Sequence, residues 1–185
     1  MTTHVALLRG INVGRAKQVP MAELKAVFEG CGCTDVTTVL RSGNVVYSSD
    51  QRPDGLGESL EAELLRRTGV QSSMLLLDAA TLLRIAADNP LVDVGTDPSR
   101  LFVGFTFELP ALTALNVAAV PAPELLSPEV LVVGERAVYQ WCPDGISASQ
   151  VPASFWKLVA PVVTVRNWRT VTRLVDLVTL AGSHQ

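Results

Sequence analysis

The chain is organised around the stretch Arg9-Gly10-Ile11-Asn12-Val13-Gly14-Arg15-Ala16-Lys17. It follows an apolar run that indicates a strand over residues 5–8, and it precedes an amphipathic pattern that opens at Pro20. The stretch carries three cations, two glycines and an asparagine, but no acid. We predict a polar loop that one half of an internally duplicated fold carries and the other half lacks.

The residues after this loop predict a helix and a hairpin. Apolar side chains recur after Pro20 at the spacing of one helix face, and Gly30 and Gly32 end the pattern. A strand over residues 36–40 leads into a tight turn, and residues 45–47 form the return strand. The turn consists of Arg41, Ser42, Gly43 and Asn44, and the inward helix face of Leu24, Val27, Phe28 and Cys31.

The remainder of the first half alternates in the same way. Residues 51–57 are rich in Pro, Gly and Asp and indicate a loop, after which a second helix runs to Gly69. Residues 74–77 predict a strand, and Asp78 is placed to cap a third helix. The inward faces of the two helices are Leu56, Leu60 and Leu64, and Leu82, Ile85 and Ala86.

The second half repeats this order. Pro110 is expected to open a helix, and Asn167 to cap the last one, which presents Val171, Leu174, Val175 and Val178. A short helix is expected over residues 152–159. Strands are predicted at residues 101–107, 130–133, 137–141 and 162–165.

The landmarks of the two halves superpose with a nearly constant offset. Pro110 stands 90 positions after Pro20, and Asn167 stands 89 positions after Asp78. We therefore predict an α+β protein of two ferredoxin-like (βαββαβ-type) repeats, each followed by an extra helix. The expected halves are residues 1–93 and 100–185, with a linker at residues 94–99.

One connection breaks the repeat. Leu8 and Pro20 are separated by 11 residues, whereas Phe107 and Pro110 are separated by two, so the first half carries roughly nine extra residues. Long loops in compact domains commonly serve function. In the predicted topology the hairpin turn at residues 41–44 lies on the same sheet edge as this loop.

Cations and glycines at that edge favour an anion or phosphate site. The alternative is a solvated basic loop whose Asn and Gly residues serve its turns. Ser42 could act as a nucleophile only if Lys17 or another base reached it. The residues expected to bind the ligand are Arg9, Asn12, Arg15, Lys17, Arg41, Ser42 and Asn44.

Three blocks of this sequence resemble the signature blocks of the domain-of-unknown-function 1697 family. They are Arg9-Gly10-Ile11-Asn12-Val13-Gly14, Arg41-Ser42-Gly43-Asn44-Val45-Val46 and Thr164-Val165-Arg166-Asn167-Trp168-Arg169-Thr170-Val171. Gly145-Ile146-Ser147 and Lys157 also match, whereas Ala160-Pro161 and Arg15-Ala16 depart from the family's pattern. The resemblance implies a bacterial-type cytoplasmic protein of two related α+β halves, and it implies no activity.

A second basic segment lies near the C-terminus. Trp168 stands at a helix start and could stack on a ring between Arg166 and Arg169, or it could belong to the core. The residues of this secondary basic patch are Lys157, Arg166, Trp168 and Arg169.

Composition excludes several classes of protein. The net charge of -3 argues against a protein built mainly to hold nucleic acid. Cys31, Cys33 and Cys142 lack metal-ligand spacing, so we expect free buried or half-buried thiols, no metal and no cofactor. His4 and His184 lie near the termini, which disfavours a histidine-based catalytic triad. No targeting or membrane segment is visible, which favours a cytoplasmic protein.

Three functions remain open at this point. The first is binding of a small anionic ligand, a nucleotide or phosphorylated metabolite, with or without catalysis. The second is nucleic-acid binding on the sheet, for which only Tyr47 offers an aromatic ring. The third is a structural or interaction module, either a monomer or a weak homodimer.

Overall fold

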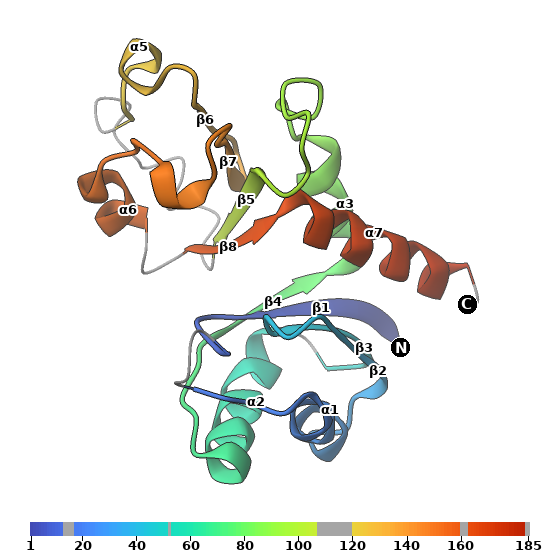
Figure 1. Ribbon diagram of the computed structural model, residues 1–185. Coiled ribbons are helices and arrows are strands. Elements are labelled where there is room, and N and C mark those ends of the chain that lie inside the picture. Colours follow the sequence, from blue (N-terminus) through green and yellow to red (C-terminus); the bar gives the residue numbers. More distant parts are fainter. Residues whose placement is uncertain (13–16, 52, 107–119, 160–162, 184–185) are drawn as a thin grey trace. The chain divides into compact units, whose positions relative to one another are not determined.

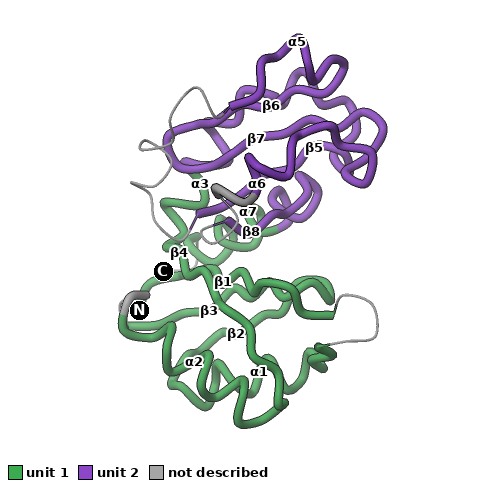
Figure 2. The backbone as a smooth tube through the Cα atoms, turned by 90° about the vertical axis from the view of Figure 1, so that its left-hand side faces the viewer, with its two compact units in different colours: residues 1–83, 174–185 green, residues 84–173 purple. Residues whose placement is uncertain are grey.

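The computed structural model of the protein describes residues 1–12, 17–51, 53–106, 120–159 and 163–183. These residues form a mixed α+β structure with two four-stranded antiparallel sheets (Figure 1). The chain divides into two compact units, Met1–Leu83 with Leu174–Gln185, and Arg84–Arg173 (Figure 2). The predicted division at residues 94–99 stays a prediction.

The N-terminal sheet has the strand order β2-β3-β1-β4, and each neighbouring pair is antiparallel. One helix connects β1 to β2 and another connects β3 to β4, so both connections cross over an intervening strand. The bounds are β1 Thr2–Leu8, α1 Met21–Gly30, β2 Thr34–Val39, β3 Asn44–Ser49, α2 Pro53–Thr68, β4 Met74–Asp78 and α3 Ala79–Ala87.

The sheet of the second unit has the corresponding order β6-β7-β5-β8, again antiparallel throughout. Its bounds are β5 Leu101–Thr106, α5 Pro123–Leu126, β6 Val130–Val133, β7 Ala137–Trp141, η2 Ile146–Ala148, α6 Ala153–Val159, β8 Val163–Asn167 and α7 Trp168–Gly182. Apart from the two short helices α5 and η2, the described elements were predicted from the sequence.

The core of the N-terminal unit forms where α1 and α2 cover one face of its sheet (Figures 1 and 2). Side chains three and four positions apart point to one side of a helix, so each helix buries a continuous stripe. Both ends of the polar loop also enter this core, because Ile11 and Val19 are each only 3% exposed. The fully buried stripe residues are Leu24, Val27 and Phe28 of α1 and Leu60 and Leu64 of α2.

Predicted and observed helix starts can be compared at several positions. Asp78 and Asn167 both cap helices, because each side-chain oxygen accepts a bond from the backbone N–H three residues later. The loop predicted over residues 51–57 is wrong, because α2 begins at Pro53. Proline fits the first turn of a helix, and the buried Leu56 draws that turn onto the core. The helix predicted at Pro110 lies outside the described residues.

Gly43 is the tightest point of the β2–β3 hairpin. Its φ of +76° lies in the left-handed region that favours glycine. A Cβ atom at this position would come within 2.8 Å of Leu8 Cβ and 2.9 Å of Ile11 Cδ1. The hairpin therefore packs against the end of β1 at a distance that only glycine permits.

We expect Gly43→Ala to lower the free energy of unfolding by about 3 kcal/mol, since left-handed strain and overpacking add. Gly10→Ala is the matched control, because Gly10 has a similar φ of +65° but no atom within 4 Å of the place where a methyl group would stand. It should cost only about 1 kcal/mol. Urea unfolding measures both values, and equal losses would contradict the close packing at Gly43.

The second unit contains a buried carboxylate that is held by several donors. Glu129 is 6% exposed, and its Oε1 accepts hydrogen bonds from Gln140 Nε2 and from Ser149 Oγ at 2.7 Å. Its Oε2 accepts the backbone N–H of Gln150 at 2.7 Å. The thiol of Cys142 lies 3.5 Å from Oε1, and burial together with this carboxylate raises the thiol pKa to about 12. Glu129 thus ties the segment after η2 to β7.

Glu129→Ala should destabilise the protein by about 3 kcal/mol, because it leaves buried donors without an acceptor. Glu124→Ala, at an exposed position of α5, should change stability by less than about 0.5 kcal/mol. Thermal or urea unfolding of the two variants side by side tests this expectation. A loss at Glu129 no larger than that at Glu124 would contradict it.

Candidate functional site

Three loops meet where β1 ends. The backbone N–H of Leu8 donates to Gly43 O at 2.8 Å, and the next N–H, of Arg9, donates to Ser73 O at 3.0 Å. Successive amides of one strand thus bond to opposite neighbours, the β2–β3 hairpin on one side and the loop before β4 on the other. The hairpin lies beside the polar loop, as the predicted topology required.

Asn12 fastens the polar loop to this edge. Its Nδ2 donates to Arg41 O at 2.7 Å and to Val19 O at 3.1 Å, while its Oδ1 accepts the Val19 N–H at 2.8 Å. Its backbone N–H donates to Lys17 O at 2.9 Å. The side chain predicted to contact a ligand therefore serves backbone groups, and its effect on a ligand would come through the shape of the loop.

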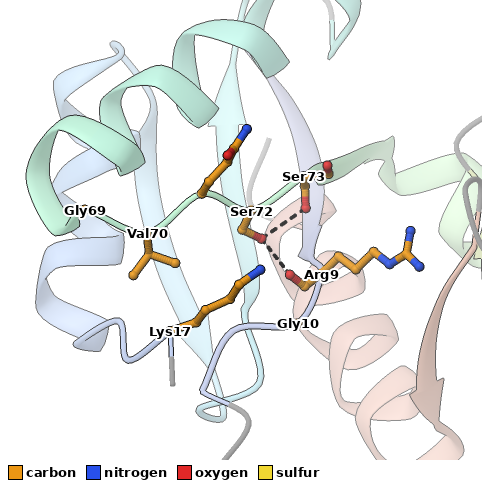
Figure 3. A pocket seen from close by; sticks show the side chains of 8 residues that line it. Arg9, Gly10, Lys17, Gly69, Val70, Ser72 and Ser73 are labelled. Atoms are coloured by element: carbon orange, nitrogen blue, oxygen red, sulfur yellow. Dashed lines mark hydrogen bonds between the residues drawn. The ribbon is translucent and has the colours of Figure 1, made fainter. Parts of the chain in front are cut away.

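A pocket of about 580 Å³ opens between the end of β1 and the α2–β4 loop (Figure 3). Ser72 links the two sides of the pocket, because this 5% exposed side chain donates its hydroxyl to Arg9 O at 2.8 Å. Figure 3 shows the Lys17 side chain running toward Ser72 and the Arg9 guanidinium extending away from Lys17. The residues that line the pocket are Arg9, Gly10, Lys17, Gly69, Val70, Gln71, Ser72 and Ser73.

The charged side chains of the lining are all cationic. Arg9 and Lys17 are both exposed, and the eight lining residues include no acid. Arg41, the cation of the hairpin, is exposed but does not belong to the lining. The structure thus brings Arg9 and Lys17 to one pocket, with Arg41 outside it.

Left-handed backbone conformations are concentrated in the loops at this edge. Six of the nine described residues with φ between +51° and +89° lie in the three loops. They are Gly10, Asn12, Lys17, Leu40, Gly43 and Gly69. A left-handed conformation is costly for Lys and Leu, and such strain is concentrated at functional sites in proteins.

The other predicted ligand residues have different surroundings. Asn44 is fully buried, and its Nδ2 donates to Val39 O at 2.9 Å and to Ser42 Oγ at 2.9 Å, which shapes the hairpin. Arg15 lies outside the described residues. Gln71 and Ser73 are not among the predicted site residues, because they carry no charge and belong to no motif. The antiparallel pairing of β1 with β4 would have placed them at this edge.

The described side chains of the secondary basic patch differ in their exposure. Arg166 is 9% exposed, donates to Thr164 Oγ1 at 3.1 Å and to Val165 O at 2.9 Å, and burial lowers its pKa to about 10. Trp168 is half-buried and Arg169 is exposed at the start of α7. Lys157 belongs to α6, and its side chain lies outside the described part of the chain.

His4 is remote from solvent. It is 4% exposed and stacks on Tyr47 with ring centroids 5.4 Å apart, and burial lowers its pKa. Cys31, Cys33 and Cys142 are free, half-buried or buried thiols, as predicted. Within the described ranges, no group of three or more His, Cys, Asp or Glu residues could hold a metal ion. No described helix has the length and hydrophobicity needed to cross a membrane.

Both comparisons that find a match lead to proteins without an assigned function. A family model described as "Protein of unknown function (DUF1697)" matches residues 1–139. A solved structure of the conserved bacterial protein SP0830 from Streptococcus pneumoniae is 23% identical and superposes with a TM-score of 0.72. That match covers 96% of this chain and 98% of the other, and at this identity it shows the fold alone. No curated protein matches the chain significantly.

Replacement of Asn12 should loosen the loop. Asn12→Ala removes three side-chain hydrogen bonds at a φ of +55°, so we expect a loss of about 2 kcal/mol in unfolding free energy. Asn12→Gly relieves the left-handed strain and should recover part of that loss. Urea unfolding distinguishes the two contributions. Wild-type stability in Asn12→Ala would show that these bonds do not hold the loop.

Proposed function

Because the chain belongs to the DUF1697 family, described as proteins of unknown function, we propose a role from its own N-terminal geometry. The protein binds a small anionic ligand, a nucleotide or a phosphorylated metabolite, in the pocket at the end of β1. Arg9 and Lys17 supply the positive charge, and residues 69–73 supply the facing wall. Asn12 and Asn44 act on the shape of the loops and do not contact the ligand.

The observation that carries this proposal is that two cationic residues, Arg9 and Lys17, line the pocket and that no acidic residue does. Hydrogen bonds from Arg or Lys to phosphate are among the stronger polar contacts, and a recess lined by one sign of charge raises the local concentration of counter-ions. The volume of about 580 Å³ falls within the range of small-molecule pockets. The constrained backbone adds preorganisation, which reduces the cost of ordering the site on binding.

The alternative of nucleic-acid binding has less support. The sheet face opposite α1 and α2 carries Val5, Leu7, Val46, Leu75 and Leu77, all buried. Single-stranded RNA recognition on a sheet uses exposed aromatic rings, and these side chains are aliphatic. We therefore retain the small anion as the ligand class.

We also infer that the two sheets derive from one duplicated ferredoxin-like unit. Each residue of β8 stands 89 positions after its counterpart in β4, from Met74 and Val163 to Asp78 and Asn167. The caps match as well, since Asp78 bonds Thr81 and Asn167 bonds Thr170. The two strand orders correspond position by position, and both agree with the pattern of βαββαβ units.

Removal of either pocket cation should weaken anion binding. In a thermal-shift screen at low ionic strength, phosphorylated metabolites should raise the melting temperature of the wild type, with inorganic phosphate as the simplest probe. Lys17→Ala and Arg9→Ala should each lower the affinity about tenfold, the value of one charge-assisted hydrogen bond.

Lys25→Ala is the matched control for Lys17→Ala. Lys25 is a 51% exposed lysine of the same unit that lies outside the pocket lining, and its ion pair with Glu29 is a surface contact of little energy. Lys17 already adopts a left-handed φ of +51°, so alanine adds little backbone strain there. Equal affinities in the wild type, Lys17→Ala and Arg9→Ala would refute the proposed function.

A further inference from the structure

We propose that the ligand of this pocket is a phosphorylated sugar or polyol, and that the pocket makes no place for a nucleobase. The inference rests on the proposed function and narrows its ligand class. A phosphorylated sugar and a nucleotide carry the same phosphate group. The choice between them therefore depends on the uncharged residues of the pocket.

The loops at this edge contain no ring on which a base could stack. Residues 9–17, 40–44 and 69–73 include no Phe, Tyr, Trp or His in the sequence itself. Nucleobases are commonly held by stacking on aromatic side chains. Residues 13–16 are included, because only the identity of the amino acids matters for this point. The base of a nucleotide therefore gains no stacking partner from these loops.

The neutral wall of the pocket is instead built from hydrogen-bonding groups. Gln71 and Ser73 are exposed at the lining and together offer an amide and a hydroxyl, which can both donate and accept. Val70 is the one side chain of this wall that is hydrocarbon alone, and it is only 9% exposed. Such a wall matches a chain of hydroxyl groups better than a flat aromatic ring.

Two glycines extend this polar character to the backbone. Gly10 and Gly69 both line the pocket, and no atom lies within 4 Å of the place where a Cβ would stand. A ligand can therefore approach the backbone at these two positions without a side chain in the way, although Arg9 O already accepts the Ser72 hydroxyl and the Gly69 N–H already donates to Leu65 O.

The two kinds of group come from different loops. Arg9 and Lys17 belong to the loop after β1, whereas Gln71 and Ser73 belong to the loop before β4. Two hydrogen bonds hold these loops together. The backbone N–H of Arg9 donates to Ser73 O at 3.0 Å, and the Ser72 hydroxyl donates to Arg9 O at 2.8 Å. A ligand with phosphate at one end and hydroxyls at the other can contact both loops at once.

Ribose 5-phosphate and AMP test this inference directly, because AMP is the same phosphorylated ribose with a base in place of the hydroxyl group at C1. Titration calorimetry of the full chain should give ribose 5-phosphate an affinity at least about fivefold above inorganic phosphate, as expected for one added hydrogen bond. AMP should bind no more tightly than ribose 5-phosphate. Unphosphorylated ribose should bind at least about tenfold more weakly than ribose 5-phosphate, since it lacks the charged contact.

Two variants measure the contributions of the two pocket walls to binding separately. Gln71→Ala, at an exposed side chain, should lower the affinity for ribose 5-phosphate about fivefold more than it lowers that for inorganic phosphate. Lys17→Ala should lower the affinity for both ligands. This pattern would assign the neutral wall to the hydroxyl groups and the cationic wall to the phosphate.

The outcomes distinguish this inference from the proposal on which it rests. AMP bound about tenfold more tightly than ribose 5-phosphate would overturn the inference and leave an anion site in place. Ribose 5-phosphate and inorganic phosphate of equal affinity would overturn it as well, since the hydroxyl groups would then contribute nothing. Failure of every phosphate compound to bind in a Lys17-dependent way would overturn both.

Discussion

The pairing of β1 with two antiparallel neighbours is the constraint on which the N-terminal unit depends. At its end, the N–H of Leu8 bonds to the hairpin at Gly43 and the N–H of Arg9 bonds to Ser73. These two bonds fix the register in which three loops, far apart in the sequence, share one edge. Loops held by a rigid sheet are where proteins commonly place binding groups. The pocket is therefore a consequence of the strand order.

The same constraint separates the polar residues of this edge by role. Asn12 and Asn44 donate hydrogen bonds to backbone carbonyl groups at this edge. Arg9, Lys17, Gln71 and Ser73 have exposed side chains. Residues of the first kind hold the loops in shape, and those of the second kind are the side chains that we propose for ligand binding. Both kinds are hydrophilic, so composition alone does not distinguish them.

Much of the described secondary structure could be predicted because apolar periodicity and caps are local signals. Asp78 and Asn167 illustrate this, since each stands immediately before the helix that it caps. The start of α2 was misread because Pro53 and the glycines after it are typical of loops, whereas burial of Leu56 decides the conformation. The wall at residues 69–73 was missed because strand pairing alone brings it to the site.

The central claim is that an anion binds between the loop after β1 and the loop before β4. An NMR titration of the ¹⁵N-labelled chain with inorganic phosphate tests it most directly, because each backbone amide reports its own surroundings. The account predicts saturable shifts centred on Gly10, Lys17 and residues 69–73, with Ser149 of the Glu129 network unaffected. Shifts centred on Arg41 and Ser42, or on the second unit, would contradict it.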